Sequence, residues 1–364
     1  MPEAERLELR HATGVTELAV GRGRELAGAA LAGWAAGRAV FVVTSAPIWE
    51  LHGRACLDAV AEVASSFEVL AVPDGEAAKT PEVAAGLWQR ILAGGGKRDS
   101  RVVTFGGGAV GDVGGFVAGT YMRGVPLAHV PTTLLAQVDA AVGGKAAISL
   151  PGAKNAVGVF HHPRHVVAAT AVLETLPPRQ LKAGLVEVVK AAALLDPRLF
   201  AELERSLDGL LAAGADRVGL VAAAQRAKIG VVERDPEEHG ERRVLNFGHT
   251  LGHALEASLP PGALLHGEAV AYGMAFATAL ARRRGLEAGF ERRLGGLLAR
   301  LDPPPLPACA VAPLLRCIER DKKARHDGPV WVLPTGVGAW EAARLPRSEV
   351  ADALAAFVES PAAC

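Results

Sequence analysis

In the first half of the chain, short runs of β-branched and apolar residues alternate with longer stretches whose apolar residues have helical spacing. The runs that read as buried strands are 39–44, 67–72, 101–105 and 127–130. One intervening stretch has a clear helix start, with Thr80 as N-cap, Pro81 at the first helical position and periodic apolar residues through Leu92. Such alternation predicts an α/β domain with a mostly parallel, Rossmann-like sheet.

The pattern changes after Pro177 and Pro178, where long stretches rich in Ala, Leu, Glu and Arg begin and few β-branched runs occur before 330–333. This composition predicts an all-α second domain. Two prolines cannot continue the interior of a strand or helix, and a chain of 364 residues favours two domains over one. We therefore expect an α/β domain over 1–177 and a helical domain over 178–364, with the active site in the cleft between them.

The charge balance excludes some partners. The chain has 39 basic and 39 acidic side chains, so no overall field attracts nucleic acid or an anionic membrane. No uncharged apolar stretch approaches the roughly 20 residues that span a bilayer, and the N-terminus does not resemble a signal peptide. We expect a cytoplasmic protein. Its four cysteines are too scattered for a zinc knuckle or a redox pair: Cys56, Cys309, Cys317 and Cys364.

A glycine-rich turn follows the run 101–105 directly and precedes an apolar helical stretch; it reads Gly106-Gly107-Gly108-Ala109-Val110-Gly111-Asp112. Glycines let backbone amides approach a pyrophosphate closely, and the N-terminus of the following helix favours negative charge. A tight turn that needs positive φ would explain only one or two of these glycines. The segment therefore predicts phosphate binding, although it is not a GxGxxG fingerprint.

Polar side chains gather in the loops after the next run, where α/β sheets bind ligands. They are Thr132, Thr133, Asp139, Lys145, Lys154 and Asn155. Lys145 alone would be read as a solvated surface lysine. Gly143 and Gly144 before it permit a close backbone approach, which favours an anion site.

Three histidines of the second half indicate a divalent metal site. His249 and His253 are at i and i+4 and share a helix face, and His266 opens the next apolar stretch. Neutral imidazoles need a carboxylate to offset the charge of the ion. Spacing alone leaves that carboxylate open between Glu187, Glu256 and Glu268. Glu187 is the best candidate, because apolar pairs flank it on both sides and a buried carboxylate is normally paired or bound to a metal.

Several long segments, taken in order, resemble the 3-dehydroquinate synthase family of sugar phosphate cyclases. They are 74–80, 106–112, 114–124, 130–145, 154–155, 175–179, 184–190, 246–257, 265–274 and 321–323. The resemblance runs from about residue 70 to 340. It implies a dehydroquinate synthase-like fold, a cofactor NAD, one Zn²⁺ or Co²⁺ per subunit and a small anionic sugar phosphate as substrate.

The same resemblance implies a role for individual residues. NAD would be held by Asp74, Gly75, Glu76, Lys79, Gly107, Gly108, Ala109, Val110, Gly111, Asp112, Thr132, Thr133, Lys145, Lys154, Val172, Leu173, Glu174 and Thr175. The metal would be held by Glu187, His249 and His266. The substrate would be surrounded by Asp139, Lys145, Asn155, Lys190, Lys228, Arg242, Asn246, His253 and one of Lys322 and Lys323, with Arg123 reaching across a homodimer interface.

The implied reaction converts 3-deoxy-D-arabino-heptulosonate 7-phosphate to 3-dehydroquinate by transient oxidation, phosphate elimination, re-reduction, ring opening and aldol closure. Alternatives are another sugar phosphate cyclase, a metal-dependent NAD polyol dehydrogenase of related architecture, and a binding protein that has kept the fold. The chain departs from the family pattern at 44–46, at Ala140 and at Ala146. These departures concern cofactor affinity more than the reaction.

Overall fold

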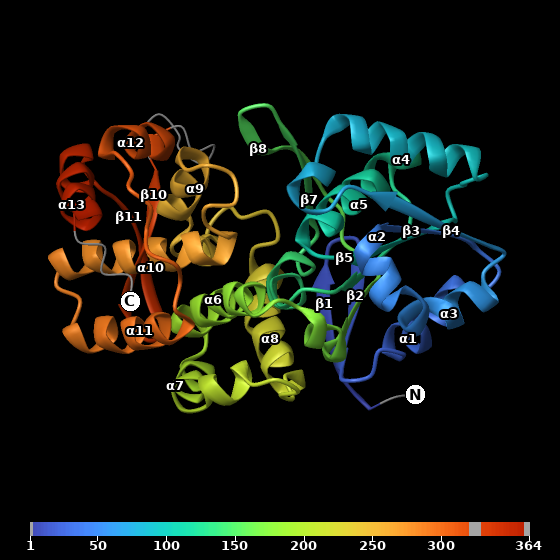
Figure 1. Ribbon diagram of the computed structural model, residues 1–364, viewed down its shortest axis with the longest axis horizontal. Coiled ribbons are helices and arrows are strands. Elements are labelled where there is room, and N and C mark those ends of the chain that lie inside the picture. Colours follow the sequence, from blue (N-terminus) through green and yellow to red (C-terminus); the bar gives the residue numbers. More distant parts are fainter. Residues whose placement is uncertain (1–2, 320–328, 360–364) are drawn as a thin grey trace. The chain divides into compact units, whose positions relative to one another are not determined.

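The computed structural model describes residues 3–319 and 329–359, which form two compact units (Figure 1). The first unit comprises Met1–Leu176 and Asp216–Glu237, and the second comprises Pro177–Ala215 and Glu238–Cys364. The chain passes from the first to the second at Pro177, where the paired prolines indicate a boundary. Residues 216–237 differ from the expectation of one continuous second domain, because they pack with the first unit.

The first unit contains a seven-stranded sheet with the order β1-β2-β9-β6-β5-β3-β4. Its strands are β1 (Ala4–His11), β2 (Gly14–Gly21), β3 (Ala39–Ser45), β4 (Ser66–Val72), β5 (Arg101–Gly106), β6 (Leu127–Pro131) and β9 (His165–Ala169). All neighbours pair in parallel except β1 and β2. The prediction of a mostly parallel sheet is confirmed, and the four predicted strands correspond to β3, β4, β5 and β6.

Helices cover both faces of this sheet. Helices α1 (Leu26–Ala35) and α3 (Arg54–Val63) lie on one face, and α4 (Pro81–Ala93) and α5 (Gly108–Thr120) lie on the other (Figure 1). Because both faces are covered, the central strands are mostly apolar, and Val42, Val43 and Val103 are fully buried. The chain leaves β3 for the outer strand β4 and returns to β5 on the other side of β3. The carboxyl ends of β3 and β5 are therefore the topological switch point, where such sheets bind ligands.

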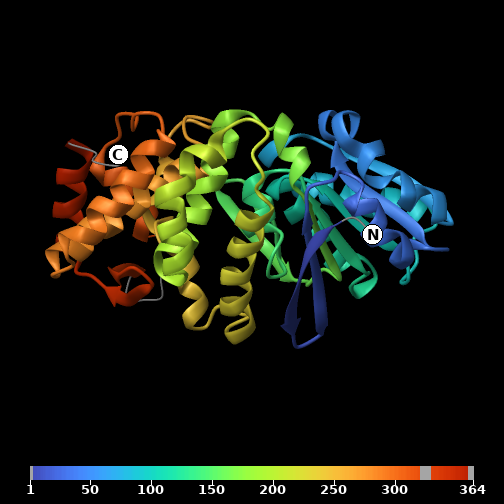
Figure 2. The ribbon, with the colours of Figure 1, turned by 90° about the horizontal axis from the view of Figure 1, so that it is seen from below.

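Helix α8 (Val218–Arg234) completes the first unit, although the chain reaches it only after two helices of the second. It runs beside the hairpin β1–β2 (Figure 2). Ile229 and Val232 of α8 share a buried cluster with Leu9, Leu18 and Val166. This buried apolar contact explains why α8 belongs to the sheet rather than to the helices around it in sequence.

The second unit is built around two long buried helices, α6 (Pro178–Leu195) and α10 (His266–Arg283). Around them lie α7 (Pro197–Leu211), α9 (His249–Ser258), α11 (Ala288–Leu301), α12 (Val311–Glu319) and α13 (Arg347–Glu359). The prediction of a helical domain is confirmed with one addition. The β-branched run at 330–333 forms a hairpin of β10 (Val330–Gly336) and β11 (Ala339–Arg344), whose Trp331 is buried against Phe276.

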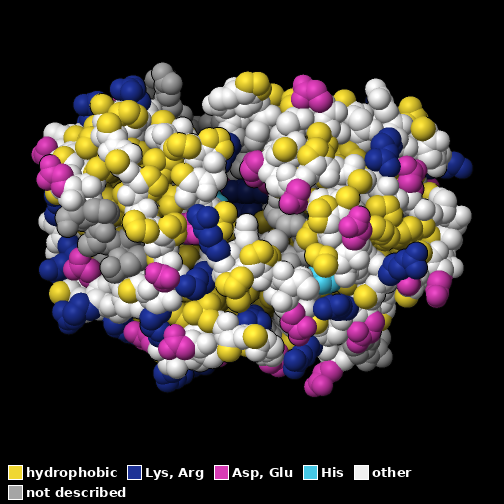
Figure 3. All heavy atoms as spheres, viewed as in Figure 1, with side chains coloured by type: hydrophobic (Ala, Val, Ile, Leu, Met, Phe, Trp, Pro, Cys, Tyr) yellow, Lys and Arg dark blue, Asp and Glu magenta, His cyan; other side chains and the backbone are white. Residues whose placement is uncertain are grey.

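The distribution of surface charge and the hydropathy of the helices both agree with the composition. On the face shown in Figure 3, basic and acidic side chains are interspersed. Across residues 3–319 and 329–359, no helix combines the length and the hydropathy that a membrane crossing requires.

The start of α4 gives a first test. The hydroxyl of Thr80 accepts a hydrogen bond from the amide of Val83 at 3.2 Å, as expected for an N-cap. Thr80→Ala should lower the free energy of unfolding by about 0.5–2 kcal/mol, whereas Thr80→Ser, which keeps the acceptor, should change it far less. Urea denaturation of both variants measures the difference; equal losses would show that the cap hydrogen bond does not stabilise the helix.

Candidate active site

The glycine-rich turn lies at the switch point, between the end of β5 and the start of α5. Gly107 is the N-cap of α5, so the first-turn amides and the positive end of the helix dipole point to the same place. None of Gly106, Gly107, Gly108 and Gly111 has positive φ. Positive φ therefore does not explain these glycines. The remaining explanation is that another group approaches their backbone closely.

A small hollow adjoins this turn, and Gly107, Gly108 and Gly111 are among the residues that line it. A Cβ atom on Gly111 would meet no atom within 4 Å, so the space beside this glycine is open. A Cβ atom on Gly107 would lie 3.2 Å from Thr133. The turn thus fits the diphosphate of a dinucleotide, which needs bare backbone beside a helix N-terminus.

A buried lysine joins two of the predicted groups beside the turn. Lys79 is 3% exposed, and its ammonium donates to the carboxylate of Asp112 at 2.6 Å and to the side-chain carbonyl of Asn155. Burial raises the pKa of Asp112, and the charge and hydrogen bond of Lys79 oppose that shift. The structure therefore brings together two predicted NAD residues and one predicted substrate residue, Asn155.

The other predicted cofactor residues lie at neighbouring ends of the sheet. Asp74, Gly75 and Glu76 form an exposed turn after β4. Thr132 and Thr133 follow β6, and the hydroxyl of Thr132 has no hydrogen-bond partner in the described part of the chain. Residues 172–175 form a 3₁₀ turn after β9, in which Thr175 accepts a hydrogen bond from His52 at 2.8 Å. Lys145 and Lys154 lie on a separate hairpin, β7 (Lys145–Leu150) and β8 (Ala153–Phe160).

The predicted substrate residues Asp139 and Lys228 form an ion pair inside the first unit. Asp139 lies in η4, a single π-helical turn at Ala136–Ala140, and Lys228 reaches it from α8. The Lys228 ammonium also donates to the main-chain carbonyl of Asp139 at 2.6 Å. This pair depends on α8 packing with the sheet.

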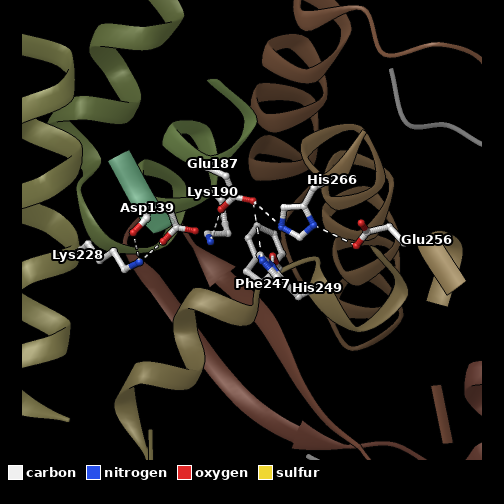
Figure 4. A network of polar contacts seen from close by, with 8 residues as sticks. All are labelled: Asp139, Glu187, Lys190, Lys228, Phe247, His249, Glu256 and His266. Atoms are coloured by element: carbon white, nitrogen blue, oxygen red, sulfur yellow. Dashed lines mark hydrogen bonds and ion pairs between the residues drawn. The ribbon is translucent and has the colours of Figure 1, made fainter. Parts of the chain in front are cut away.

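Three helices of the second unit bring Glu187, His249 and His266 together, as Figure 4 shows. Nε2 of His249 lies 3.9 Å from Oε1 of Glu187, and Nε2 of His266 lies 3.7 Å from the same oxygen. Ligand atoms about 2.1 Å from a tetrahedral metal ion are separated by about 3.4 Å. The spacing is therefore close to that around a Zn²⁺ or Co²⁺ ion.

Hydrogen bonds at the far side of each ring fix the tautomers. Nδ1 of His249 donates to the carbonyl of Phe247 at 3.2 Å, and Nδ1 of His266 donates to Glu256 at 3.1 Å. Both acceptors lack a hydrogen, so in the neutral rings both Nε2 atoms carry lone pairs that face Glu187. Neither carboxylate oxygen of Glu187 accepts a hydrogen bond from the described residues, although Oε2 is in an ion pair with Lys190. Two lone pairs that face a carboxylate only 2% exposed are an arrangement that suits a bound metal ion.

The three carboxylates that spacing left open differ in their contacts. Glu187 faces both imidazoles, and Glu256 lies behind His266, where it orients the ring. Burial lowers the pKa of His266, but the hydrogen bond and charge of Glu256 and the charge of Glu187 outweigh it, so the net shift is upward. Glu268 instead accepts two hydrogen bonds from Arg179, at 2.6 and 2.8 Å, and one from the amide of Leu265.

Glycines set the distances between the three helices. A Cβ atom on Gly267 of α10 would lie 2.0 Å from the carbonyl of Ala183 on α6. One on Gly273 would lie 1.7 Å from the carbonyl of Gly248, which precedes α9 in a left-handed conformation (φ 79°). The backbones of α6, α9 and α10 therefore touch, and side chains as short as Glu and His can meet.

The remaining predicted substrate residues of the second unit lie near this cluster in sequence or contact it. Lys190 is buried against Glu187, and Arg242 is 2% exposed. Asn246 donates to Glu238, and His253 is exposed with its ring in contact with the rings of His249 and His266. His253, Glu256 and His266 form a second group of close ligand atoms, so geometry does not by itself exclude the i, i+4 alternative. Lys322 and Lys323 lie outside the described residues.

Sequence reasoning missed three buried polar residues of the first unit. His129 and Thr104 share a hydrogen bond of 2.6 Å beside the hollow, and burial lowers the pKa of His129 to about 4, so that the ring is neutral at physiological pH. Gln137 is fully buried within η4. A histidine inside a strand and a glutamine beside an aspartate carry no spacing signal that could have identified them.

A glycine-rich turn at a sheet's switch point and a cluster of one carboxylate and two histidines are typical of a nucleotide- and metal-dependent enzyme. Comparison with known proteins gives the family. The 3-dehydroquinate synthase N-terminal family model matches residues 69–183, and the C-terminal model matches 184–324. The 3-dehydroquinate synthase of Geobacter metallireducens is 45% identical over 87% of this chain and 89% of its own length. That of Symbiobacterium thermophilum is 44% identical over 83% and 85%. The chain belongs to the 3-dehydroquinate synthase family.

Solved structures agree with this assignment. A 2-epi-5-epi-valiolone synthase from Streptomyces hygroscopicus with NAD⁺ and Zn²⁺ bound is 29% identical, with a TM-score of 0.86 over 94% of this chain and 97% of that one. A 2-deoxy-scyllo-inosose synthase with carbaglucose-6-phosphate, NAD⁺ and Co²⁺ is 25% identical, with a TM-score of 0.85 over 96% and 99%. A glycerol dehydrogenase from Schizosaccharomyces pombe, at 17% identity and a TM-score of 0.68, shares the fold.

Metal content of purified variants tests the ligand set. Glu187→Ala and His266→Ala each remove a donor of the cluster and should bind Zn²⁺ or Co²⁺ far more weakly than the wild type. Glu256→Gln weakens the acceptor behind His266 and should reduce affinity about 10- to 100-fold. His253→Ala should keep close to one ion per subunit, because its ring is not needed for the cluster. An empty His253 variant beside a loaded His266 variant, measured by elemental analysis after dialysis, would contradict this ligand set.

Proposed function

We propose that this chain converts 3-deoxy-D-arabino-heptulosonate 7-phosphate to 3-dehydroquinate and phosphate, a carbon–oxygen lyase reaction of the shikimate pathway. The observation that carries the proposal is the identity of 40–45% to curated 3-dehydroquinate synthases over most of the chain. The solved cyclases of other substrates are 24–29% identical, and the glycerol dehydrogenase shares the fold alone. Activity as another sugar phosphate cyclase, or as an NAD polyol dehydrogenase, is therefore less well supported.

The cofactors are NAD and one Zn²⁺ or Co²⁺ ion. When bound, NAD accepts and returns a hydride at C5 of the substrate, and the metal makes the hydroxyl at that carbon easier to deprotonate. The backbone of residues 107–112 would hold the diphosphate, and Glu187, His249 and His266 would hold the metal. The neutral tautomers fixed by Phe247 and Glu256 keep both Nε2 atoms ready to coordinate.

Recognition of the substrate requires cations, because it carries a carboxylate and a phosphate. Arg242 offers a planar fork for two parallel hydrogen bonds, and Lys145, Lys190 and Lys228 offer compact charges. Asn155, Asn246 and His253 would add hydrogen bonds to hydroxyl or phosphate oxygens. The proposal requires residues of both units to act on one substrate molecule. We also propose a cytoplasmic location, since a doubly anionic substrate does not cross a membrane unaided.

We further propose that the enzyme is a homodimer in which Arg123 completes the active site of the second copy. Met122 and Arg123 are exposed and have positive φ, a strained conformation that a function can maintain. Exposed apolar side chains occur beside them and on the hairpin β7–β8: Met122, Leu150, Val157 and Phe160. Such side chains suit burial against a partner of the same kind.

Cofactor recycling tests the reaction. Because the hydride returns to the substrate within one turnover, 3-dehydroquinate and phosphate should accumulate well beyond the amount of NAD supplied. Phosphate release and the absorbance of NADH, followed together with the heptulosonate phosphate as substrate, measure this. NADH that builds up one to one with product would instead identify a dehydrogenase.

Hybrid dimers test the role of Arg123. Arg123→Ala and Lys145→Ala should each be nearly inactive alone, since each removes a cation from the anion pocket. Mixing them should restore part of the activity, because one hybrid site retains both residues. Subunit exchange must be verified with differently tagged chains, and proven exchange without rescue would place Arg123 in the active site of its own subunit or outside it.

A further inference from the structure

Two buried glutamines fix the turn that carries Asp139, one from within the turn and one from α8. Gln137 lies inside η4, and Gln225 lies on α8, one helical turn before Lys228. Both side chains are 0% exposed. No role in the proposed reaction follows from their chemistry alone, since an amide neither titrates nor carries charge.

Gln137 joins two strands where their ladder ends. The ladder between β6 and β9 consists of Ala128 with His165 and His129 with Val166. Beyond it, the side-chain amide of Gln137 donates to the carbonyl of Pro131 at 3.1 Å and to that of Ala169 at 3.2 Å. The amide therefore replaces the missing ladder at the carboxyl ends of both strands and anchors η4 there.

Gln225 fixes α8 to the same turn. Its amide donates to the main-chain carbonyl of Gln137 at 2.8 Å. Gln225 and Lys228 are at i and i+3 and share a helix face. One therefore contacts residue 137 and the other contacts residue 139, and this double contact sets the position of the Lys228 ammonium relative to Asp139.

The side-chain oxygens of both glutamines have no hydrogen-bond partner among the described residues, which indicates that the N–H groups are the important part of each amide. Oε1 of Gln137 and Oε1 of Gln225 are buried and have no hydrogen-bond partner within 3–319 and 329–359. A buried acceptor without a partner destabilises the fold, so a core selected for stability alone would have an apolar side chain of similar size there. The hydrogen bonds that both amides make come from their N–H groups, which donate to the main-chain carbonyls of Pro131, Ala169 and Gln137.

We infer that Gln137 and Gln225 are positioning residues that hold the Asp139–Lys228 pair in its substrate-binding geometry. The inference rests on the proposed function, because it assumes that this pair contacts the substrate. Removing the Gln225 amide should let α8 and η4 shift, while NAD affinity and metal content stay unchanged.

A double-mutant cycle tests this. Gln225→Met keeps the length of the side chain and removes its donor, and it should lower kcat/KM about 10- to 100-fold. Lys228→Met removes the ammonium that Gln225 positions. If Gln225 acts through Lys228, the double variant should be no slower than Lys228→Met alone. Multiplicative losses, or a Gln225→Met variant with wild-type kcat/KM, would overturn the inference.

Thr16→Val is the matched control, because Thr16 is 1% exposed and its hydroxyl donates to the carbonyl of Pro163 at 2.6 Å in the same unit. It should reduce the melting temperature as Gln225→Met does, yet leave kcat/KM unchanged. Hydrogen exchange of the amides of 136–142 should accelerate in Gln225→Met and not in Thr16→Val. This readout also separates the two proposals: a wild type inactive on the heptulosonate phosphate would refute the function, whereas unchanged exchange in Gln225→Met would refute the positioning role.

Discussion

The metal cluster depends on direct contact between the backbones of α6, α9 and α10. Gly267 and Gly273 of α10 face main-chain carbonyls of Ala183 and Gly248 at distances that leave no room for a Cβ atom. Ordinary helix pairs lie 8–10 Å apart because side chains separate them. Here the side chains are absent at the contacts, so Glu187, His249 and His266 can converge, and helix packing sets their geometry.

Glycines have a different purpose in the α/β unit. None of Gly106, Gly107, Gly108 and Gly111 has positive φ, and the space beside Gly111 in the first turn of α5 is open. The missing side chains let helix backbones touch in the second unit, whereas the missing side chain of Gly111 leaves space in which a ligand could approach the backbone. A change from glycine to alanine at these positions would therefore affect function, although glycine itself carries no functional group.

Sequence reasoning could predict the strands, the Thr80 cap and a cluster of histidines, because each depends on local spacing or residue chemistry. Spacing alone could not choose between Glu187, Glu256 and Glu268, and only the apolar residues on both sides of Glu187 favoured it. The partner that each carboxylate faces in space is not encoded in spacing. Sequence reasoning also assigned α8 to the second domain from its position in the chain. Long-range burial of Ile229 and Val232 decides that point, and Asp139–Lys228 and the glutamine contacts follow from it.

The placement of α8 also constrains the order in which the protein can fold during synthesis. A ribosome that has released residues up to Leu176 has produced every strand of the large sheet but not the helix that covers Leu9, Leu18 and Val166. That apolar surface stays uncovered until residue 237 has emerged, by which time α6 and α7 of the other unit are already present. The nascent chain therefore exposes an aggregation-prone apolar face during the synthesis of about 60 residues, and a chaperone could bind this face during that period.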